Sequence, residues 1–115
     1  MSVEHDLLAI EQQLWTGGPE AYRSNLEPSC LVMFKEMAGA MPKEDVAKSA
    51  EKGRWKDVSM TPKGLVPPGG DAVIPTYECV AKRQNDETRR AFVSSGYVKR
   101  PDGWKLAFHR QTARD

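Results

Sequence analysis

His109 is the first residue of this sequence to consider for chemistry, because an imidazole titrates near neutral pH and can act as a general base. A catalytic histidine needs a carboxylate to orient it. Glu78 could supply that carboxylate if the predicted strands that carry the two residues lie side by side. A histidine that satisfies its hydrogen bonds within a sheet or an interface is the alternative interpretation. The other histidine, His5, is expected to be exposed.

Tyrosines and methionines are the best candidates for lining a binding pocket. A tyrosine joins an apolar ring to a polar tip, and a flexible thioether suits an adaptable pocket wall. Ordinary core packing is the alternative for both residue types. The residues concerned are Tyr22, Tyr77 and Tyr97, and Met33, Met37 and Met41.

The charge of the chain is balanced overall but uneven along it. The net charge is +1, which argues against a strongly basic nucleic-acid binder. Residues 82–115 carry nine Lys or Arg and four Asp or Glu, a net charge of +5, so residues 1–81 carry −4. This favours an electropositive rim for an anionic ligand, although solvated strand faces would give the same composition. Arg110 could present a bidentate guanidinium to such a ligand, or form a surface ion pair.

No metal, cofactor or membrane span is predicted. The two histidines are more than a hundred residues apart, and Cys30 and Cys79 stand alone, so the usual metal-ligand spacing is lacking. Both cysteines are expected to be buried free thiols. No apolar run approaches 18 residues, and the first residues do not resemble a signal peptide. A cytoplasmic location is therefore the default expectation.

Apolar residues at helical spacing open the chain, and they position the candidates that follow. Val3, Leu7, Ile10 and Leu14 predict an amphipathic helix, with the charged and amide residues on its opposite face. The segment Thr16-Gly17-Gly18-Pro19 is expected to end this helix with a left-handed glycine cap. Prolines suited to a first helical turn predict two shorter helices over residues 20–26 and 43–51.

Strands dominate the rest of the sequence. Residues 30–34 predict a strand buried on both faces, followed by a loop at 38–40. From residue 55 the hydrophobic period is two, which predicts antiparallel strands over 55–66, 72–83, 89–100 and 104–112. The turn before the last strand places Gly103 at a positive φ. Helices followed by strands indicate a single α+β domain over residues 1–115, with the helices on one face of the sheet.

Alternation along the strands suggests which side chains share a face. Tyr77 is expected to face the helices, whereas the orientation of residues 89–100 stays open. On the last strand, Leu106, Phe108 and Arg110 would share one face and His109 the other. Together these expectations name the candidate ligand-binding residues as Trp15, Tyr22, Met33, Met41, Tyr77, Ser95, Tyr97, Phe108 and Arg110.

The opening Leu-Trp-Thr-Gly-Gly-Pro of residues 14–19 and the closing Gly103-Trp104 and His109-Arg110-Gln111-Thr112 carry a family resemblance. Together they resemble the nuclear transport factor 2-like superfamily, and more narrowly its uncharacterised bacterial branch related to the SnoaL-like and ketosteroid-isomerase-like proteins. The resemblance implies a cone-shaped, curved antiparallel sheet wrapped around N-terminal helices, a pocket at the mouth of the cone and a homodimer through the outer sheet face. Such proteins include isomerases, dehydratases, cyclases, binding domains and oligomerisation modules, so fold alone does not fix function.

The resemblance also suggests where an acid–base pair would stand. The base of the related isomerases aligns with Phe34 here, and the nearest acid is Glu36. The second acid would fall near residues 95–97, where this chain has none. Three functions stay open: a pocket for a small hydrophobic or weakly anionic ligand, a dimeric interaction module without catalysis, and an isomerase, dehydratase or cyclase with a non-standard acid–base pair. Neither a nucleic-acid partner nor a membrane is predicted.

Overall fold

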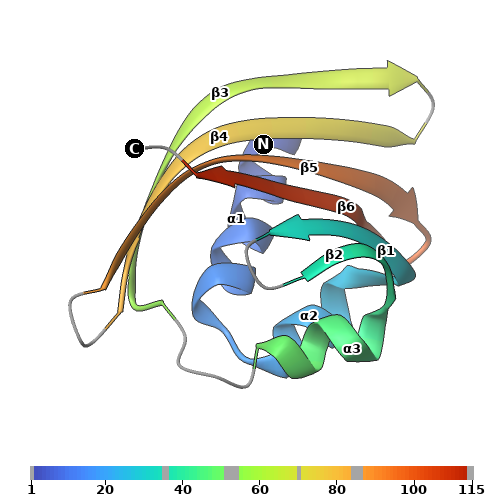
Figure 1. The fold of residues 1–115 in the computed structure, drawn as a ribbon. Helices are drawn as coiled ribbons and strands as arrows, with labels where there is room; N and C mark the ends of the chain where they lie inside the picture. Colours follow the sequence, from blue (N-terminus) through green and yellow to red (C-terminus); the bar gives the residue numbers. More distant parts are fainter. Residues whose placement is uncertain (1, 35–36, 51–54, 70, 84–86, 114–115) are drawn as a thin grey trace.

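A computed structural model describes residues 2–34, 37–50, 55–69, 71–83 and 87–113 (Figure 1). In this part of the chain, three helices lie against one face of a strongly curved, six-stranded sheet. The sheet bends over the first helix and does not close on itself. The predicted α+β class and the cone-like arrangement are confirmed.

The helices are α1 (Val3–Thr16), α2 (Pro19–Asn25) and α3 (Lys43–Ser49). Helix α1 begins after Ser2, whose hydroxyl oxygen accepts a hydrogen bond from the backbone N–H of His5 at 3.1 Å. It ends at Gly17, but the φ of Gly17 is −87°, so the predicted left-handed cap is wrong. Gly17 is instead suited to a close approach, since an added Cβ would lie 2.6 Å from the carbonyl oxygen of Gln13.

The strands are β1 (Leu26–Phe34), β2 (Met37–Pro42), β3 (Asp57–Gly69), β4 (Ala72–Lys82), β5 (Thr88–Arg100) and β6 (Gly103–Ala113). Their order in the sheet is β2-β1-β6-β5-β4-β3. Strand β1 runs parallel to β6, while the other neighbours are antiparallel, so the sheet is mixed and not purely antiparallel. The loop predicted at residues 38–40 is also wrong, because these residues pair with β1 as part of β2.

Strand β1 is buried on one face only. Cys30 and Val32 are almost fully buried among the side chains beneath the sheet, whereas Leu31 and Met33 are about half exposed. The expectation of burial on both faces is therefore wrong for this chain, because the helices cover only the inner side of the sheet. Cys30 and Cys79 are buried free thiols, as predicted. Burial raises the pKa of each to about 12, which keeps both protonated and unreactive.

A β-bulge in β6 decides which of its side chains face inward. Gly96 of β5 pairs with Phe108 and Tyr97 pairs with Leu106, so Ala107 is one residue extra. The bulge interrupts the alternation, and Leu106 and His109 are both buried on the inner face. The prediction that Leu106, Phe108 and Arg110 share a face is wrong for this reason. Arg110 is exposed.

No helix in the described ranges is long and apolar enough to cross a membrane.

Candidate functional site

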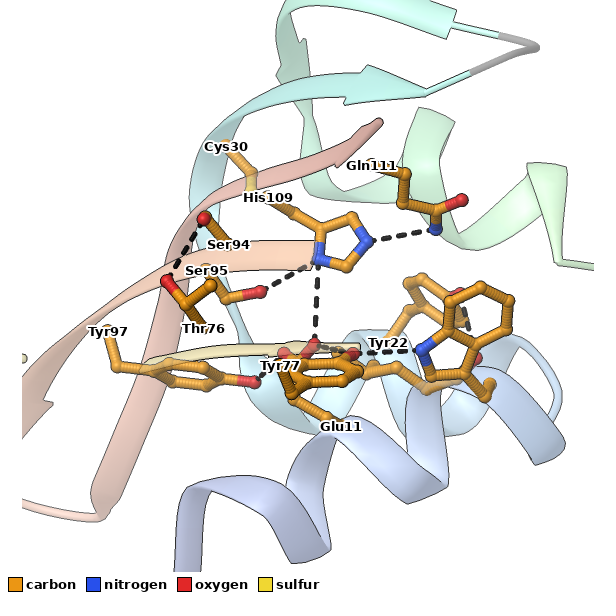
Figure 2. Close-up of polar contacts among 12 residues, drawn as sticks. Glu11, Tyr22, Cys30, Thr76, Tyr77, Ser94, Ser95, Tyr97, His109 and Gln111 are labelled. Atoms are coloured by element: carbon orange, nitrogen blue, oxygen red, sulfur yellow. Dashed lines mark hydrogen bonds and ion pairs between the residues drawn. The ribbon is translucent and has the colours of Figure 1, made fainter. Parts of the chain in front are cut away.

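The carboxylate of Glu11 lies at the centre of a buried polar network beneath the sheet (Figure 2). Helix α1 carries Glu11 into the core, where its exposed fraction is 0%. The hydroxyl of Tyr77 donates a hydrogen bond to Glu11 Oε1 at 2.5 Å, and the hydroxyl of Tyr97 donates to Oε2. Trp15 Nε1 donates in turn to the Tyr77 hydroxyl at 2.9 Å. Both carboxylate oxygens therefore have donors, as a buried charge requires.

The two tyrosines act as fixed proton donors in this network. Burial, reinforced by the neighbouring carboxylate of Glu11, raises the pKa of Tyr77 and of Tyr97 well above the usual tyrosine value. Both hydroxyls consequently stay protonated at neutral pH. They come from neighbouring strands, β4 and β5, and so join α1 to the middle of the sheet.

His109 extends the network from Glu11 toward the rest of the sheet. Its Nδ1 lies 3.7 Å from Glu11 Oε1 and 2.9 Å from the hydroxyl oxygen of Ser95. Its Nε2 lies 3.0 Å from Gln111 Nε2. Figure 2 shows the ring between Ser95 and Gln111, with the Glu11 carboxylate facing Nδ1.

The hydrogen bonds of Gln111 assign the proton on the His109 ring. Arg89 donates to Gln111 Oε1 at 3.0 Å, so the amide nitrogen of Gln111 is the atom that faces His109. An amide nitrogen can only donate, which makes Nε2 the acceptor and leaves the proton on Nδ1. Burial lowers the pKa of His109, partly opposed by the charge of Glu11, and this favours the same neutral ring.

A cavity of about 320 Å³ opens beside His109, at the end of the sheet where β4 and β5 meet. Its walls come from all three helices and from β1, β5 and β6, together with residues next to β3 and β4. Most of the lining side chains are apolar, and the polar ones gather around His109 and near the β4–β5 connection. The lining residues are Leu14, Trp15, Tyr22, Val32, Phe34, Val46, Ser49, Trp55, Arg83, Glu87, Arg89, Leu106, His109 and Gln111.

No protein-family model matches the sequence, and no curated protein matches it at a significant level. Solved structures do match the fold. An NTF2-like protein of unknown function in nutrient uptake from Rhodospirillum rubrum superimposes with a TM-score of 0.82, over 100% of both chains at 11% identity. This chain has the nuclear transport factor 2-like (NTF2-like) fold.

Other solved structures with this fold carry names that indicate different functions. A putative ketosteroid isomerase from Parabacteroides distasonis matches with a TM-score of 0.80 at 12% identity, over 99% of this chain and 89% of that one. The association domain of C. elegans CaMKII matches with a TM-score of 0.72 at 15% identity, over 95% and 91% of the two chains. Likeness at this level of identity establishes the fold, and function must be argued from the site.

The NTF2-like cone brings some of the predicted ligand-binding residues to the cavity. Trp15 and Tyr22 line it, and the Tyr22 hydroxyl donates to the carbonyl oxygen of Leu14 at 2.8 Å. Tyr77, Ser95 and Tyr97 are buried in the network around Glu11 and His109.

Other predicted residues lie away from the cavity. Met41 packs against the core, and Met33 is about half exposed on the outer face of the sheet. Phe108 and Arg110 also point outward, as a consequence of the bulge in β6.

The predicted acid partner of His109, Glu78, is not the carboxylate found beside it. Glu78 lies on the outer face of β4, between the inward-facing Tyr77 and Cys79, and its Oε1 is 3.9 Å from Lys63 Nζ. His109 faces inward, so Glu78 is on the opposite side of the sheet. Glu36 lies outside the described residues.

Glu11 is a residue of the candidate site that the sequence analysis missed. It lies four residues after Leu7 and four before Trp15, in the middle of the apolar stripe of the first helix. A charged side chain at such a position signals a buried and partnered group. The described residues contain no cluster of three or more His, Cys, Asp or Glu side chains that could hold a metal ion.

Proposed function

We propose that this chain binds a small, mainly apolar organic molecule in the cavity and holds one polar group of that molecule at His109. The observation that carries the proposal is the placement of a neutral imidazole of assigned tautomer on the wall of a largely apolar cavity. Small-molecule sites have this composition, an apolar lining with a few fixed polar groups. The apolar body of the ligand would lie against Trp15, Trp55 and Phe34.

The hydrogen bonds of His109 define the polar group that the ligand would carry. Nε2 accepts a hydrogen bond from the amide of Gln111, which a hydroxyl or N–H group of a ligand could replace. If His109 also took a proton from that group, the carboxylate of Glu11 would stabilise the resulting imidazolium. The same geometry thus supports acid–base chemistry of the isomerase, dehydratase or cyclase type, with His109 and Glu11 as the pair.

Two tryptophans on the cavity wall make binding measurable. Trp15 and Trp55 are buried, so a ligand that enters the cavity should change their fluorescence. We would screen a panel of small aromatic and alicyclic alcohols, ketones, amides and acids by fluorescence and confirm each binder by calorimetry. Ser49→Phe places an aromatic ring in the cavity, whereas Ser59→Phe adds the same ring at an exposed position of β3.

The expected result is binding that Ser49→Phe abolishes and that Ser59→Phe leaves unchanged. If the chain binds no member of the panel, the cavity is not a ligand site. The same conclusion follows if every compound binds to the Ser49→Phe variant as tightly as to the wild-type chain. For acid–base chemistry, a substrate found in this way should lose at least a hundredfold in turnover with His109→Gln. Unchanged turnover would exclude that role.

The outer face of the sheet favours self-association as a second candidate function. Apolar side chains form a band across neighbouring strands, since Leu31 of β1 pairs with Phe108 of β6, and Val66 of β3 pairs with Ile74 of β4. Leu31 and Val66 are 51% and 60% exposed. A second copy of this chain would cover the band, and a structural neighbour is itself an association domain. The two functions are compatible, because the cavity lies on the inner face.

A further inference from the structure

Gln111 covers the ring nitrogen of His109 that the buried network does not use. Both residues line the cavity, and Figure 2 shows Gln111 on the side of the ring away from Glu11. The other side of the ring is closed, because Nδ1 faces Ser95 and Glu11, whose exposed fractions are both 0%. Phe34 packs edge-on against the imidazole, with the ring centroids 6.3 Å apart. A ligand in the cavity can therefore form a hydrogen bond with His109 only at Nε2, where the Gln111 amide already lies.

The direction of the hydrogen bonds makes Nε2 of His109 an acceptor. Arg89 donates to Gln111 Oε1 at 3.0 Å, and this turns the amide nitrogen of Gln111 toward the ring. Nε2 accepts from that nitrogen, and the proton of the neutral ring is on Nδ1. A ligand group that takes the place of the amide must therefore donate a hydrogen as well. A carbonyl or ether oxygen at this position would face the lone pair of Nε2 and leave both atoms without a hydrogen bond.

A hydroxyl group on the cavity wall has the same polarity as His109. The hydroxyl of Ser49, at the end of α3, donates to the backbone carbonyl oxygen of Val46 at 2.6 Å. Its hydrogen is used within the helix, so the Ser49 oxygen offers lone pairs to a ligand. The cationic donors of the lining lie elsewhere, near the β4–β5 connection, where Arg83 donates to Glu87 Oε1 at 3.1 Å. Ser49 and His109 thus both present acceptors to a molecule in the cavity.

We infer that Gln111 determines the specificity of the cavity: its amide competes for His109 Nε2 and gives way to a ligand that carries a hydroxyl group. The inference rests on the proposed function and names the chemical class of its ligand, a neutral hydroxyl compound with an apolar body. A hydroxyl fits better than an N–H group, because an amide N–H brings a carbonyl oxygen that needs a donor of its own, and an aliphatic amine is charged at neutral pH. Ketones, esters and ethers offer only acceptors and do not displace Gln111.

Calorimetry with 2-naphthol and 2-methoxynaphthalene tests the inference, because the two compounds share a ring system and only the first carries a donor. At about pH 7.5 we expect 2-naphthol to bind at least about threefold tighter than the ether to the wild-type chain. Gln111→Leu removes the competing amide and leaves Nε2 without a donor, so it should raise this ratio at least about fivefold. Gln111→Glu offers His109 an acceptor, which draws a proton to Nε2, and the ratio should fall to about one. Thr112→Leu, at an exposed position of the same strand, should leave the ratio unchanged.

Nitrogen NMR of the imidazole gives a readout that needs no ligand. We expect the His109 proton on Nδ1 in the wild type and in Gln111→Leu, and a proton on Nε2 in Gln111→Glu. A wild-type proton on Nε2 would overturn the inference. So would a ratio that does not rise in Gln111→Leu while the ether still binds, since the ether reports that the variant keeps its cavity. If neither compound binds to the wild type, the inference is wrong. In each of these cases the screen with Ser49→Phe decides the proposed function separately.

Discussion

Glu11 is a buried carboxylate whose two oxygens depend on hydroxyl donors from two different strands. Removing the carboxylate leaves the hydroxyls of Tyr77 and Tyr97 without an acceptor and opens a void in the core. We therefore expect Glu11→Ala to lower the free energy of unfolding by about 3 kcal/mol, as measured by urea denaturation. Gln13→Ala, at an exposed position of the same helix, should cost less than about 0.5 kcal/mol. A cost below about 1 kcal/mol for Glu11→Ala would show that the network contributes little to stability.

His109 should make the stability of the protein depend on pH near neutrality. Burial holds the pKa of His109 in the folded state below the ordinary value of 6.5, which the unfolded chain retains. As the pH falls below about 6.5, the unfolded state takes up a proton that the folded state does not. Stability is therefore fully present above pH 6.5 and is lost as the pH falls toward the folded pKa, with a slope of up to about 1.4 kcal/mol per pH unit.

His109→Gln provides the test, because glutamine keeps a polar side chain without titrating in this range. Urea denaturation of both proteins between about pH 8 and pH 5 would give the two pH profiles. We expect the wild-type stability to fall between about pH 6.5 and pH 5 and the variant profile to be nearly flat there. Parallel profiles would mean that groups other than His109 cause the dependence.

The residues of the candidate site differ in how far the sequence reveals them. Trp15 and Tyr22 are predictable, since their place at the end of an amphipathic helix and in the helix after it brings them to the mouth of the cone. Glu11 could also have been predicted from its spacing. It was missed because every charged residue of the first helix was assigned to the solvent-exposed face. The contact of Arg83 and Arg89 with Trp55 could not have been predicted, because only the folded sheet brings these three residues together.

At the scale of the elements, the conformation of Gly103 determines how the last strand begins. Gly103 opens β6 with a φ of +123°, a conformation that L-residues other than glycine rarely adopt. The positive φ confirms the turn predicted from Pro101, Asp102 and Gly103. We expect Gly103→Ala to lower the free energy of unfolding by about 1–2 kcal/mol. Thr112→Ala, at an exposed position of the same strand, should change it by less than about 0.5 kcal/mol. Equal effects in a denaturation experiment would mean that the turn tolerates a side chain.

The bulge at Ala107 shows why the elements were predicted better than their faces. Apolar period and turn residues are local properties, and they suffice to place four of the strands to within a few residues. A bulge depends on how two strands pair, because one extra residue in β6 is accommodated only against β5. That single residue exchanges the faces of Phe108 and His109. Strand β2 was missed for a similar reason, since its Ala-Gly-Ala sequence is strand-like only in its pairing with β1.

At the scale of the whole molecule, the two faces of the sheet have different roles. The inner face covers α1 and builds the network and the cavity, so its side chains are already buried. The outer face keeps Leu31, Met33, Val66 and Phe92 exposed in a single copy of the chain. Apolar area exposed to this degree is stabilised by association, and a self-complementary face favours a twofold dimer.

We therefore expect light scattering at micromolar concentration to give a mass of twice the 12.9 kDa of the chain. The double variant Leu31→Asp/Val66→Asp should be a monomer, because an interface that buried these aspartates would have to desolvate their charges. Val3→Asp changes a residue of similar exposure, 40%, at the start of α1, and should remain a dimer. Because the cavity faces inward, the monomeric variant should still bind the ligands that Ser49→Phe excludes. Loss of that binding on dissociation would mean that a second copy completes the site, and a monomeric wild type would remove self-association from the functions of this fold.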